Sequence, residues 1–181
     1  LSLHDALPIY SKIEGFAFLP VTCFTMALTT FVSQNLGAKQ YDRAKKGARF
    51  GVLCSITIAE LIGIIIYAAA PVLIVAFNRD PGVIHYGVMQ ARIVALFYCL
   101  LAFSHCIVAV LRGSGHAAVP MIVMLCDWCL FRVSYITVAV RLVSDIRVIL
   151  WAYPLTWSIS SVIFLYLFLR GKWVYGFEKQ K

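Results

Sequence analysis

Five ionisable side chains lie inside or directly beside long apolar stretches of this sequence: Glu14, Glu60, His105, Asp127 and Arg132. On insertion scales an ionisable group at the centre of a bilayer costs about 2.5–3.5 kcal/mol or more. Residues of this kind are therefore candidates for contacting a small molecule, holding a cation or moving a proton.

The two glutamates admit a functional and a structural interpretation. Glu60 lies within the apolar run ITIAELIGIII and is a candidate cation or proton site facing a central cavity. The alternative is a structural carboxylate that a Ser, Thr or Tyr of a neighbouring helix holds, or that stays uncharged when buried. Glu14 precedes the first apolar run, close to Lys12. It is a candidate cation-attracting residue at a cavity entrance, or an interfacial residue near the outer mouth.

Asp127 and Arg132 belong to one apolar segment but do not share a helix face. Five residues at about 100° each separate them by roughly 140°, so they do not form an i,i+4 pair. Each must find a partner on another helix or in a wet cavity. We expect Asp127 either to handle a substrate or ion or to be structural, and Arg132 either to do so or to anchor neighbouring helices. His105 is a candidate proton carrier, because histidine titrates near physiological pH, or a hydrogen-bonded structural residue.

The composition indicates helices that span a membrane. The chain has 181 residues, of which 62% are hydrophobic and only 13% charged, whereas soluble domains carry about 25% charged residues. Five runs are long enough to cross a hydrocarbon core as helices, and none alternates with a period of two as a barrel strand does. The fold class predicted is all-α integral membrane. The expected spans lie near 15–33, 51–77, 93–111, 117–140 and 148–169.

Three prolines, Pro20, Pro71 and Pro154, fall within these spans. Each removes a backbone hydrogen bond and is a candidate helix kink. Aromatic side chains that could line a cavity for a lipophilic cation are Phe16, Phe18, Phe24, Phe97, Tyr98 and Phe103. Trp151, Trp157 and Trp173 are interpreted as anchors at the membrane interface.

The basic residues indicate an orientation. If the five spans alternate, the loop at 34–50, the turn at 112–116 and the tail at 170–181 share one side. That side holds ten Lys and Arg residues and the opposite side five. By the positive-inside rule the richer side is cytoplasmic, including the C-terminus. The net charge of +8 is then explained by the orientation of the chain in the membrane. We expect a protein of the cell inner (plasma) membrane whose partner is the lipid bilayer, not nucleic acid.

The first nine residues, LSLHDALPI, have a separate interpretation. They back-translate as CTT TCC CTA CAC GAC GCT CTT CCG ATC, which resembles a common sequencing-adapter oligonucleotide. We therefore expect residues 1–9 to be an artefact and the natural N-terminus to be missing. Residues 10–169 would then form the helix bundle and 170–181 a basic cytoplasmic tail.

Two motifs, QNLGA at 34–38 and LRGSG at 111–115, carry a family resemblance together with the stretches around them. The stretch EGFAFLPVTCFTMALTTFVSQNLGAKQYDRAKKGARFG resembles the second helix and following cytoplasmic loop of a six-helix lobe in the multidrug and toxic compound extrusion (MATE) family. VLRGSGHAAVPMIVML resembles the turn between the fourth and fifth helices of that lobe, and CDWCLFRV resembles its fifth helix. The resemblance covers residues from about 10 to 181. The loop residues that carry it are Gln34, Asn35, Gly37, Arg112, Gly113 and Gly115.

The resemblance implies a twelve-helix carrier with two six-helix lobes, of which this chain represents helices eight to twelve. The first lobe of the same chain is then a missing partner. The implied function is secondary-active efflux of lipophilic or cationic small molecules by Na⁺ or H⁺ antiport and alternating access, with no cofactor or metal site. Some members carry a coupling carboxylate in the helix corresponding to 93–111, where this sequence has Ser104 and His105. The coupling ion stays open.

Two other functions remain as alternatives. A lipid-linked saccharide flippase of the same superfamily would favour a large cationic cavity, and Arg132 is the one strong cation within a span. A structural or channel subunit is the second alternative. An enzyme is not expected, because no HExxH motif, Ser/His nucleophile or paired intramembrane Asp is present. The single CxxC of Cys126 and Cys129 is too weak a signal for a metal site.

Overall fold

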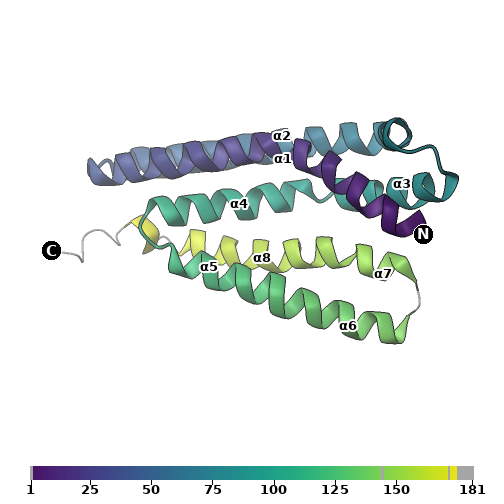
Figure 1. The fold of residues 1–181 in the computed structure, drawn as a ribbon. Coiled ribbons are helices and arrows are strands. Elements are labelled where there is room, and N and C mark those ends of the chain that lie inside the picture. The colour runs from purple at the N-terminus through teal and green to yellow at the C-terminus, as the bar shows by residue number, and fades with distance from the viewer. Residues whose placement is uncertain (1, 144, 171, 175–181) are drawn as a thin grey trace.

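The computed structural model describes residues 2–143, 145–170 and 172–174, and these are helical apart from short turns, with no strand among them. Figure 1 shows the long helices running side by side. The helices are α1 (Ser2–Gly37), α2 (Tyr41–Phe77), α3 (Pro81–Ala95), α4 (Tyr98–Gly113), α5 (Ala118–Leu125), the π-helix η1 (Cys126–Phe131), α6 (Arg132–Leu142), α7 (Ile146–Leu150), α8 (Ala152–Leu169) and the short 3₁₀ turn η2 (Lys172–Val174). The predicted all-α class is confirmed.

Membrane-spanning length is reached by four continuous helical stretches and one bent pair. The stretches are Pro8–Gly37, Tyr41–Phe77, Ala118–Leu142 and Arg147–Leu169, and the pair is α3 with α4, bent by 55°. The outward faces carry large apolar side chains, among them Phe16, Phe50 and Val72, each more than 70% exposed. An exposed apolar surface of this extent is typical of a surface that contacts lipid or another protein segment, since exposure to water is unfavourable.

The α1–α2 hairpin is closed by residues of the QNLGA motif. Asn35 is buried, and its side-chain Nδ2 donates to the main-chain carbonyl of Phe31 over 2.7 Å. The main-chain carbonyl of Asn35 accepts a hydrogen bond from the N–H of Gln40. Lys39 adopts a left-handed conformation, with φ of 58°, which ends the helix. Beyond this turn the two helices pack so closely that a Cβ on Gly47 would collide with the Phe31 ring.

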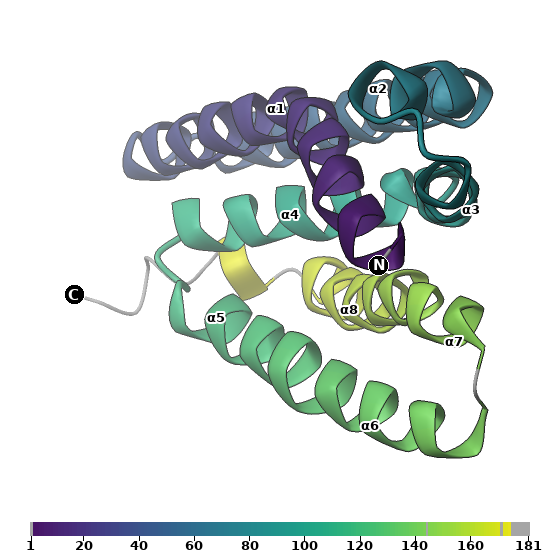
Figure 2. The ribbon, with the colours of Figure 1, turned by 45° about the vertical axis from the view of Figure 1, so that its right-hand side comes forward.

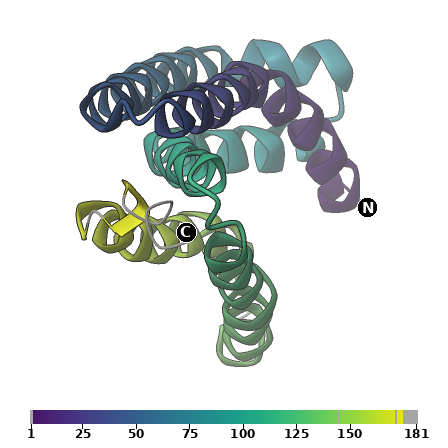
Figure 3. The ribbon, with the colours of Figure 1, turned by 90° about the vertical axis from the view of Figure 1, so that its left-hand side faces the viewer.

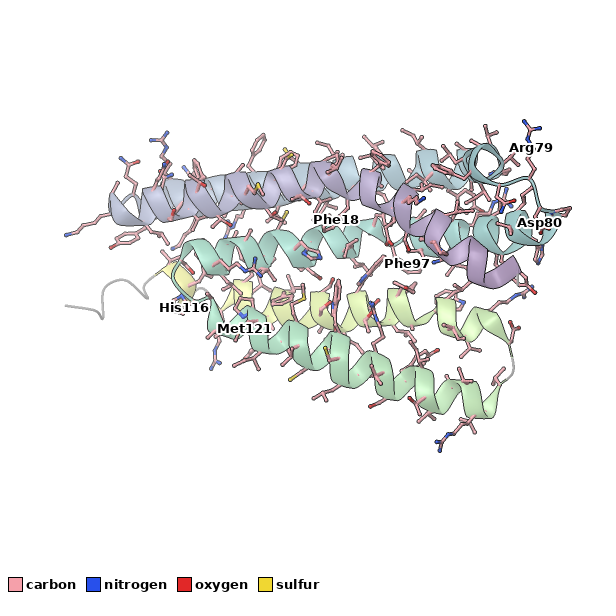
Figure 4. The ribbon with its side chains drawn as sticks, in the orientation of Figure 1. Phe18, Arg79, Asp80, Phe97, His116 and Met121 are labelled. Carbon is pink, nitrogen blue, oxygen red and sulfur yellow. The ribbon has the colours of Figure 1, made fainter. Side chains whose placement is uncertain are left out.

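The turn between α2 and α3 is fixed by a conventional cap. The Asp80 carboxylate accepts hydrogen bonds from the N–H groups of Gly82 and Val83, and Pro81 occupies the first helical position. Figure 4 shows Arg79 and Asp80 at one end of the bundle and His116 at the opposite end. The turns 38–40 and 114–117 therefore lie at the end opposite to the turn 78–80 and to the end of α6 at Leu142 (Figure 1).

The break between α3 and α4 falls at Leu96 and Phe97, inside the expected 93–111 span. The helix that reaches membrane length here starts at Pro81, twelve residues before the expected start, and bends at the break. α2 and α3 approach closely beside it: a Cβ on Gly63 would collide with the Ala95 carbonyl oxygen. The break contains no glycine or proline, so it carries no sequence signal.

The three candidate kink prolines have different surroundings. Pro20 and Pro71 lie inside the continuous helices α1 and α2. Figure 2 shows α1 changing direction within its N-terminal half, so that its first turns lean away from α2. Pro154 lies in the first turn of α8, and the N–H that it lacks would have reached the carbonyl of Leu150, the last residue of α7. It thus accounts for the interruption between α7 and α8.

α4 is the central helix. Figure 3 shows it between the α1–α2 pair and the group formed by α5, α6 and α8. Most of its side chains are buried, and Cys106, Ile107 and Val110 are fully so. Two buried apolar clusters flank it, one around Val32, Ala48 and Phe164 and one around Val21, Val94 and Trp157.

Candidate functional site

A cavity of about 410 Å³, here called the charged cavity, lies between the N-terminal part of α1 and the helices α4, η1, α6 and α8. It brings together three of the five ionisable residues singled out from the sequence, namely Glu14, His105 and Arg132. Aromatic rings form much of the remaining wall. The complete lining is Ser11, Glu14, Gly15, Phe18, Leu101, His105, Trp128, Arg132, Tyr153 and Trp157.

Arg132 is held between two aromatic rings in the wall of this cavity. Its guanidinium carbon lies 4.9 Å from the Trp128 ring centroid and 4.7 Å from that of Tyr153. Nη2 donates to Oγ1 of Thr156 over 2.7 Å. Cation–π contacts of this kind are stabilising, more so away from water. The interhelical anchoring expected of Arg132 is thus present, between α6 and α8, and the same side chain faces a cavity.

Glu14 contributes a carboxylate to the same cavity from α1. It also lines a small void with Ala17, Val21 and Ala59. Among the residues that the structure describes, no ion pair joins Arg132 to a carboxylate, and its hydrogen bond goes to Thr156. The charged cavity therefore offers one acidic and one basic group that are not paired directly.

His105 lies at the junction of two cavities. It lines the charged cavity and also a second one of about 470 Å³, here called the threonine cavity. Its ring makes edge contacts with Phe18 at 4.9 Å and with Trp128 at 6.1 Å between centroids. Figure 4 shows Phe18 in the space between α1 and α4. Nε2 is buried and has no hydrogen-bond partner in the structure.

The threonine cavity is walled by one face of α1 and by α4. Its lining is Thr22, Thr25, Met26, Thr29, Thr30, His105, Val108, Ala109 and Arg112. The hydroxyls of Thr22, Thr25 and Thr29 donate to main-chain carbonyls over 3.1, 2.7 and 2.8 Å. Their remaining lone pairs can accept from a bound group. Sequence reasoning missed this face, although the spacing of the threonines by three and four residues was a readable signal.

Asp127 lies outside both cavities, in the π-helix η1. It is 4% exposed, and neither carboxylate oxygen has a hydrogen-bond partner. The Ser160 hydroxyl lies near it, but donates to the Thr156 carbonyl at 2.9 Å instead. π-helical turns inside α-helices occur frequently at functional sites. Asp127 is therefore a buried carboxylate whose acceptors are unused in this conformation.

Buried hydroxyls join α4 to α8 next to this region. Oγ of Ser104 lies 2.9 Å from Oγ of Ser161 and 3.5 Å from Oγ of Ser160. Ser161 also donates to the Leu100 carbonyl at 3.1 Å. Ser104, which stands beside His105 in the sequence, thus belongs to a helix-joining polar cluster.

Glu60 is positioned away from the charged cavity. Its Oε2 accepts the backbone N–H of Cys99 over 3.2 Å. Cys99 is in the first turn of α4, and the cap residue Phe97 provides no side-chain acceptor of its own. A carboxylate at this position satisfies an otherwise unpaired N–H and complements the helix dipole. The partner of Glu60 in this structure is thus a main-chain N–H, where the structural alternative expected a Ser, Thr or Tyr of a neighbouring helix.

The residues of the LRGSG motif shape the end of α4. A Cβ on Gly113 would lie 2.6 Å from the Thr29 carbonyl oxygen, so the backbones of α1 and α4 approach each other closely there. Gly115 has φ of 81°, which favours glycine. Arg112 is exposed and reaches the threonine cavity. By contrast Gln34 and Gly37 are exposed, and a Cβ on Gly37 would meet no other atom.

The aromatic wall differs from the one expected. Phe18 is part of it, whereas Phe16 is 72% exposed on the outer surface. Trp157, interpreted as an interface anchor, is 2% exposed and lines the charged cavity. Trp173 is likewise buried and stacks on Phe168 with centroids 5.6 Å apart. Trp128 and Tyr153 were not singled out, since nothing local in the sequence places them opposite α1.

Membrane-length apolar helices packed side by side are typical of a multi-pass integral membrane protein. A model of the MatE family matches residues 5–138, and the chain belongs to that family. Members of this family are transporters, which agrees with the membrane-length helices.

Related proteins support the assignment. The chain is 28% identical over 167 residues to "Probable multidrug resistance protein NorM" of Thermotoga maritima, an alignment that covers 90% of this chain and 35% of the relative. Its fold is similar to that of the MATE transporter ClbM in complex with Rb⁺, with a TM-score of 0.84, 21% identity and coverage of 92% of this chain and 39% of that one. A MATE protein in complex with MaD3S matches with a TM-score of 0.85, 15% identity and coverage of 99% and 39%. The chain thus spans little more than a third of the length of these proteins.

Proposed function

We propose that the protein containing this chain exports lipophilic or cationic small molecules by secondary-active antiport. The observation that carries the proposal is the charged cavity, in which a carboxylate from α1 faces walls of Phe18, Tyr153 and Trp157. Aromatic faces and a carboxylate are the groups that attract a lipophilic cation away from water. The family and the name of the Thermotoga maritima relative point the same way.

Glu14 is proposed as the group at which substrate and coupling ion compete. A carboxylate in a low-dielectric cavity favours a bound cation or proton, and either one reduces the attraction for a second cation. The substrate can be exported against its concentration gradient if the coupling ion binds more tightly to one conformation of the protein and the substrate binds more tightly to the other. Na⁺ or H⁺ fits this role. His105 and Asp127 are proposed as secondary proton or ion acceptors, because both present buried polar atoms without partners.

Alternating access needs elements that bend, and this chain offers two. α3 and α4 meet at a 55° bend. α1 changes direction within its N-terminal half (Figure 2), and residues of this half line the charged cavity. Bent and broken helices are common at the substrate sites of secondary transporters. We propose that these bends, together with the first lobe of the same protein, change the side to which the cavity opens.

The proposed orientation places the end with the turns 38–40 and 114–117 in the cytoplasm. This end carries the basic residues of the α1–α2 hairpin, such as Lys39, Arg43 and Lys46, and Lys and Arg near a helix end favour the cytoplasmic side. The location is then a multi-pass position in the cell inner (plasma) membrane with a cytoplasmic C-terminus.

The flippase alternative requires a cavity that binds a pyrophosphate. Several cations would be needed to neutralise that group, and the residues described around the charged cavity include one guanidinium and one carboxylate. The cavity supports an exported molecule of modest charge better than a lipid pyrophosphate.

Dye accumulation in cells tests the proposal. Cells that produce the complete protein are expected to accumulate several-fold less ethidium than cells that produce an inactive control, and an ionophore that collapses the ion gradient should abolish the difference. Equal ethidium accumulation in both cell types, with the complete protein present in the membrane, would contradict the proposed export.

A further inference from the structure

A further apolar hollow lies on the outer surface of the bundle. It has a volume of about 480 Å³ and lies between α2 and α8, both of which pack against α4. Its walls include Ile56 of α2, Phe103 of α4, and Val162 and Leu165 of α8. Val162 is 68% exposed, so this hollow, here called the outer groove, opens at the surface. It shares no lining residue with the charged cavity.

The two serines in the wall of the outer groove use their hydroxyl donors within the protein. Ser158 donates to the Pro154 carbonyl over 2.7 Å, and Ser161 donates to the Leu100 carbonyl over 3.1 Å. The rest of the wall is mainly hydrocarbon. A groove of this volume is within the range of small-molecule sites, and its lining selects an apolar occupant.

The outer groove leads toward two exposed arginines. Arg49 precedes Ile56 by seven residues, which places both on one face of α2 about 10 Å apart along the axis. On α8, Val162, Tyr166 and Arg170 follow one another at intervals of four residues and share a face. The Arg170 guanidinium carbon lies 5.5 Å from the Tyr166 ring centroid. The exposed faces of both helices thus change from apolar to basic.

These two changes occur at the same end of the bundle. Ala48 of α2 belongs to one buried cluster with Phe164 of α8 and Trp173 of η2. In Figure 3 the start of α2 and the end of α8 lie on the same side, at the left, of the end that faces the viewer. Leu53 and Leu169, which are 63% and 72% exposed, lie between the outer groove and the arginines on their respective helices.

An apolar groove that ends beside exposed arginines matches the two parts of an anionic phospholipid. The headgroup layer begins where the hydrocarbon core of about 30 Å ends, and Arg170 lies about 7.5 Å beyond Leu165 along α8. Guanidinium groups bind phosphate through charge-assisted hydrogen bonds that are often bidentate. Among the described residues, Arg49 and Arg170 form no ion pair, and Asp42 is the acidic side chain at this end.

We propose that the outer groove holds an acyl chain of an anionic phospholipid whose phosphate is bound by Arg49 and Arg170. The positive charge that surrounds these two arginines at the start of α2, from Arg43 and Lys46, favours a lipid with net negative charge over a zwitterionic one. This site goes beyond the proposed export function and does not depend on it. A lipid that binds only the folded protein stabilises it, so binding is measurable as a rise in melting temperature.

The test compares two lipids that have the same acyl chains. The complete protein in detergent is titrated with dioleoylphosphatidylglycerol or dioleoylphosphatidylcholine, and its thermal unfolding is recorded. The anionic lipid should raise the melting temperature in a saturable way, with a half-saturating concentration at least about tenfold lower than that of phosphatidylcholine. Removing both guanidinium groups, as Arg49→Gln with Arg170→Gln, should raise the half-saturating concentration of the anionic lipid by about tenfold or more, because charge-assisted bonds are lost.

Arg43→Gln is the matched control for the headgroup. Arg43 is exposed on the same helix and at the same end, but six residues before Arg49 it lies about 120° away around α2. This variant should change the half-saturating concentration by less than about twofold. An effect as large as that of the double variant would overturn the site, because it would show attraction to the basic end as a whole.

Val162→Trp tests the acyl-chain part, since the larger side chain fills the outer groove from its exposed wall. It should weaken binding of the anionic lipid several-fold. Val72→Trp is the control, because Val72 is 73% exposed on α2 and does not line the outer groove. The substituted positions are all exposed, and the melting temperatures without lipid check that the variants fold.

The remaining outcomes would each contradict the proposal. Equal half-saturating concentrations for the two lipids, or unchanged binding by Val162→Trp, would show that the headgroup or the groove is not recognised. An equal rise in melting temperature with inorganic phosphate alone, or with oleate alone, would assign the site to a free anion or a fatty acid. Absence of saturable phosphatidylglycerol binding to the complete protein would show that another segment covers the outer groove, and the export function would still stand.

Discussion

Nη2 of Arg132 donates to Oγ1 of Thr156 across 2.7 Å and so joins α6 to α8 beside the charged cavity. Thr156 accepts this bond while its own hydroxyl donates to carbonyls of its helix, at 2.8 Å from Ala152 O and 2.9 Å from Tyr153 O. The threonine thereby uses its donor locally and offers its lone pair to the guanidinium.

Thr156→Val is expected to destabilise the bundle. Valine keeps the shape of threonine but leaves the Arg132 donor without an acceptor, a loss of about 1–3 kcal/mol for a buried group. Thermal unfolding of the detergent-solubilised complete protein measures the change. The control is Thr137→Val, because Thr137 is exposed on α6 and bonds only to the Val133 carbonyl, at 2.8 Å. Equal melting temperatures for the two variants would contradict the importance of the Arg132–Thr156 bond.

Gly113→Ala is expected to separate α4 from α1. Its Cβ would lie 2.6 Å from the Thr29 carbonyl oxygen, and backbone on both sides leaves no flexible atom to give way. Overpacking of this kind costs about 1–3 kcal/mol. Gly37→Ala is the matched control at the end of α1, where a Cβ meets nothing within 4 Å. Folded yield after size-exclusion chromatography should fall for the first variant only, and a fall for both would refute the packing argument.

Glu60→Gln is expected to preserve transport, whereas Glu60→Ala should lower stability by about 0.5–2 kcal/mol, as the loss of a helix cap does. Glutamine retains a side-chain oxygen that can accept the Cys99 N–H, and alanine retains none. Ethidium export and thermal unfolding are measured together. Loss of export in a stable Glu60→Gln variant would show that Glu60 carries a charge needed for coupling, against the capping role.

Cysteine labelling checks the orientation. With the six native cysteines replaced, single cysteines are introduced as Ala38→Cys and Arg79→Cys, at exposed positions on opposite ends of the bundle. A membrane-impermeant maleimide should label Arg79→Cys in intact cells and Ala38→Cys only after lysis. The reverse pattern would invert the proposed topology.

The sequence predicts the fold better than it predicts the site. Apolar runs and Lys/Arg asymmetry depend on composition over about 20 residues, so the helical class follows from them. The 55° bend at Leu96 and Phe97 does not, because it depends on tertiary contacts of Glu60 and Gly63 with the start of α4 and the end of α3. The same contacts explain why Glu60, conspicuous in an apolar run, lies outside the charged cavity.

Three ionisable residues of the charged cavity were singled out from the sequence, whereas the arrangement of the cavity was not predictable. Glu14, His105 and Arg132 stand out in the sequence because an ionisable side chain within a membrane span is energetically unfavourable and is therefore a candidate functional residue. Their convergence depends on the crossing of α1, α4 and α6, which local sequence does not encode. Trp128 and Tyr153 gain their role only through Arg132, whose guanidinium they enclose.

Transport in proteoliposomes tests the proposal that the Glu14 carboxylate couples export to an ion gradient. The complete protein is reconstituted as wild type, Glu14→Gln and Glu60→Gln, and ethidium transport is recorded under an imposed Na⁺ or H⁺ gradient. Ethidium transport by the wild type and by Glu60→Gln should be faster under one of the two gradients. The gradient-driven rate of Glu14→Gln should be lower by about tenfold or more, because a charged hydrogen-bonding group has been removed. Undiminished gradient-driven transport by Glu14→Gln would contradict the account.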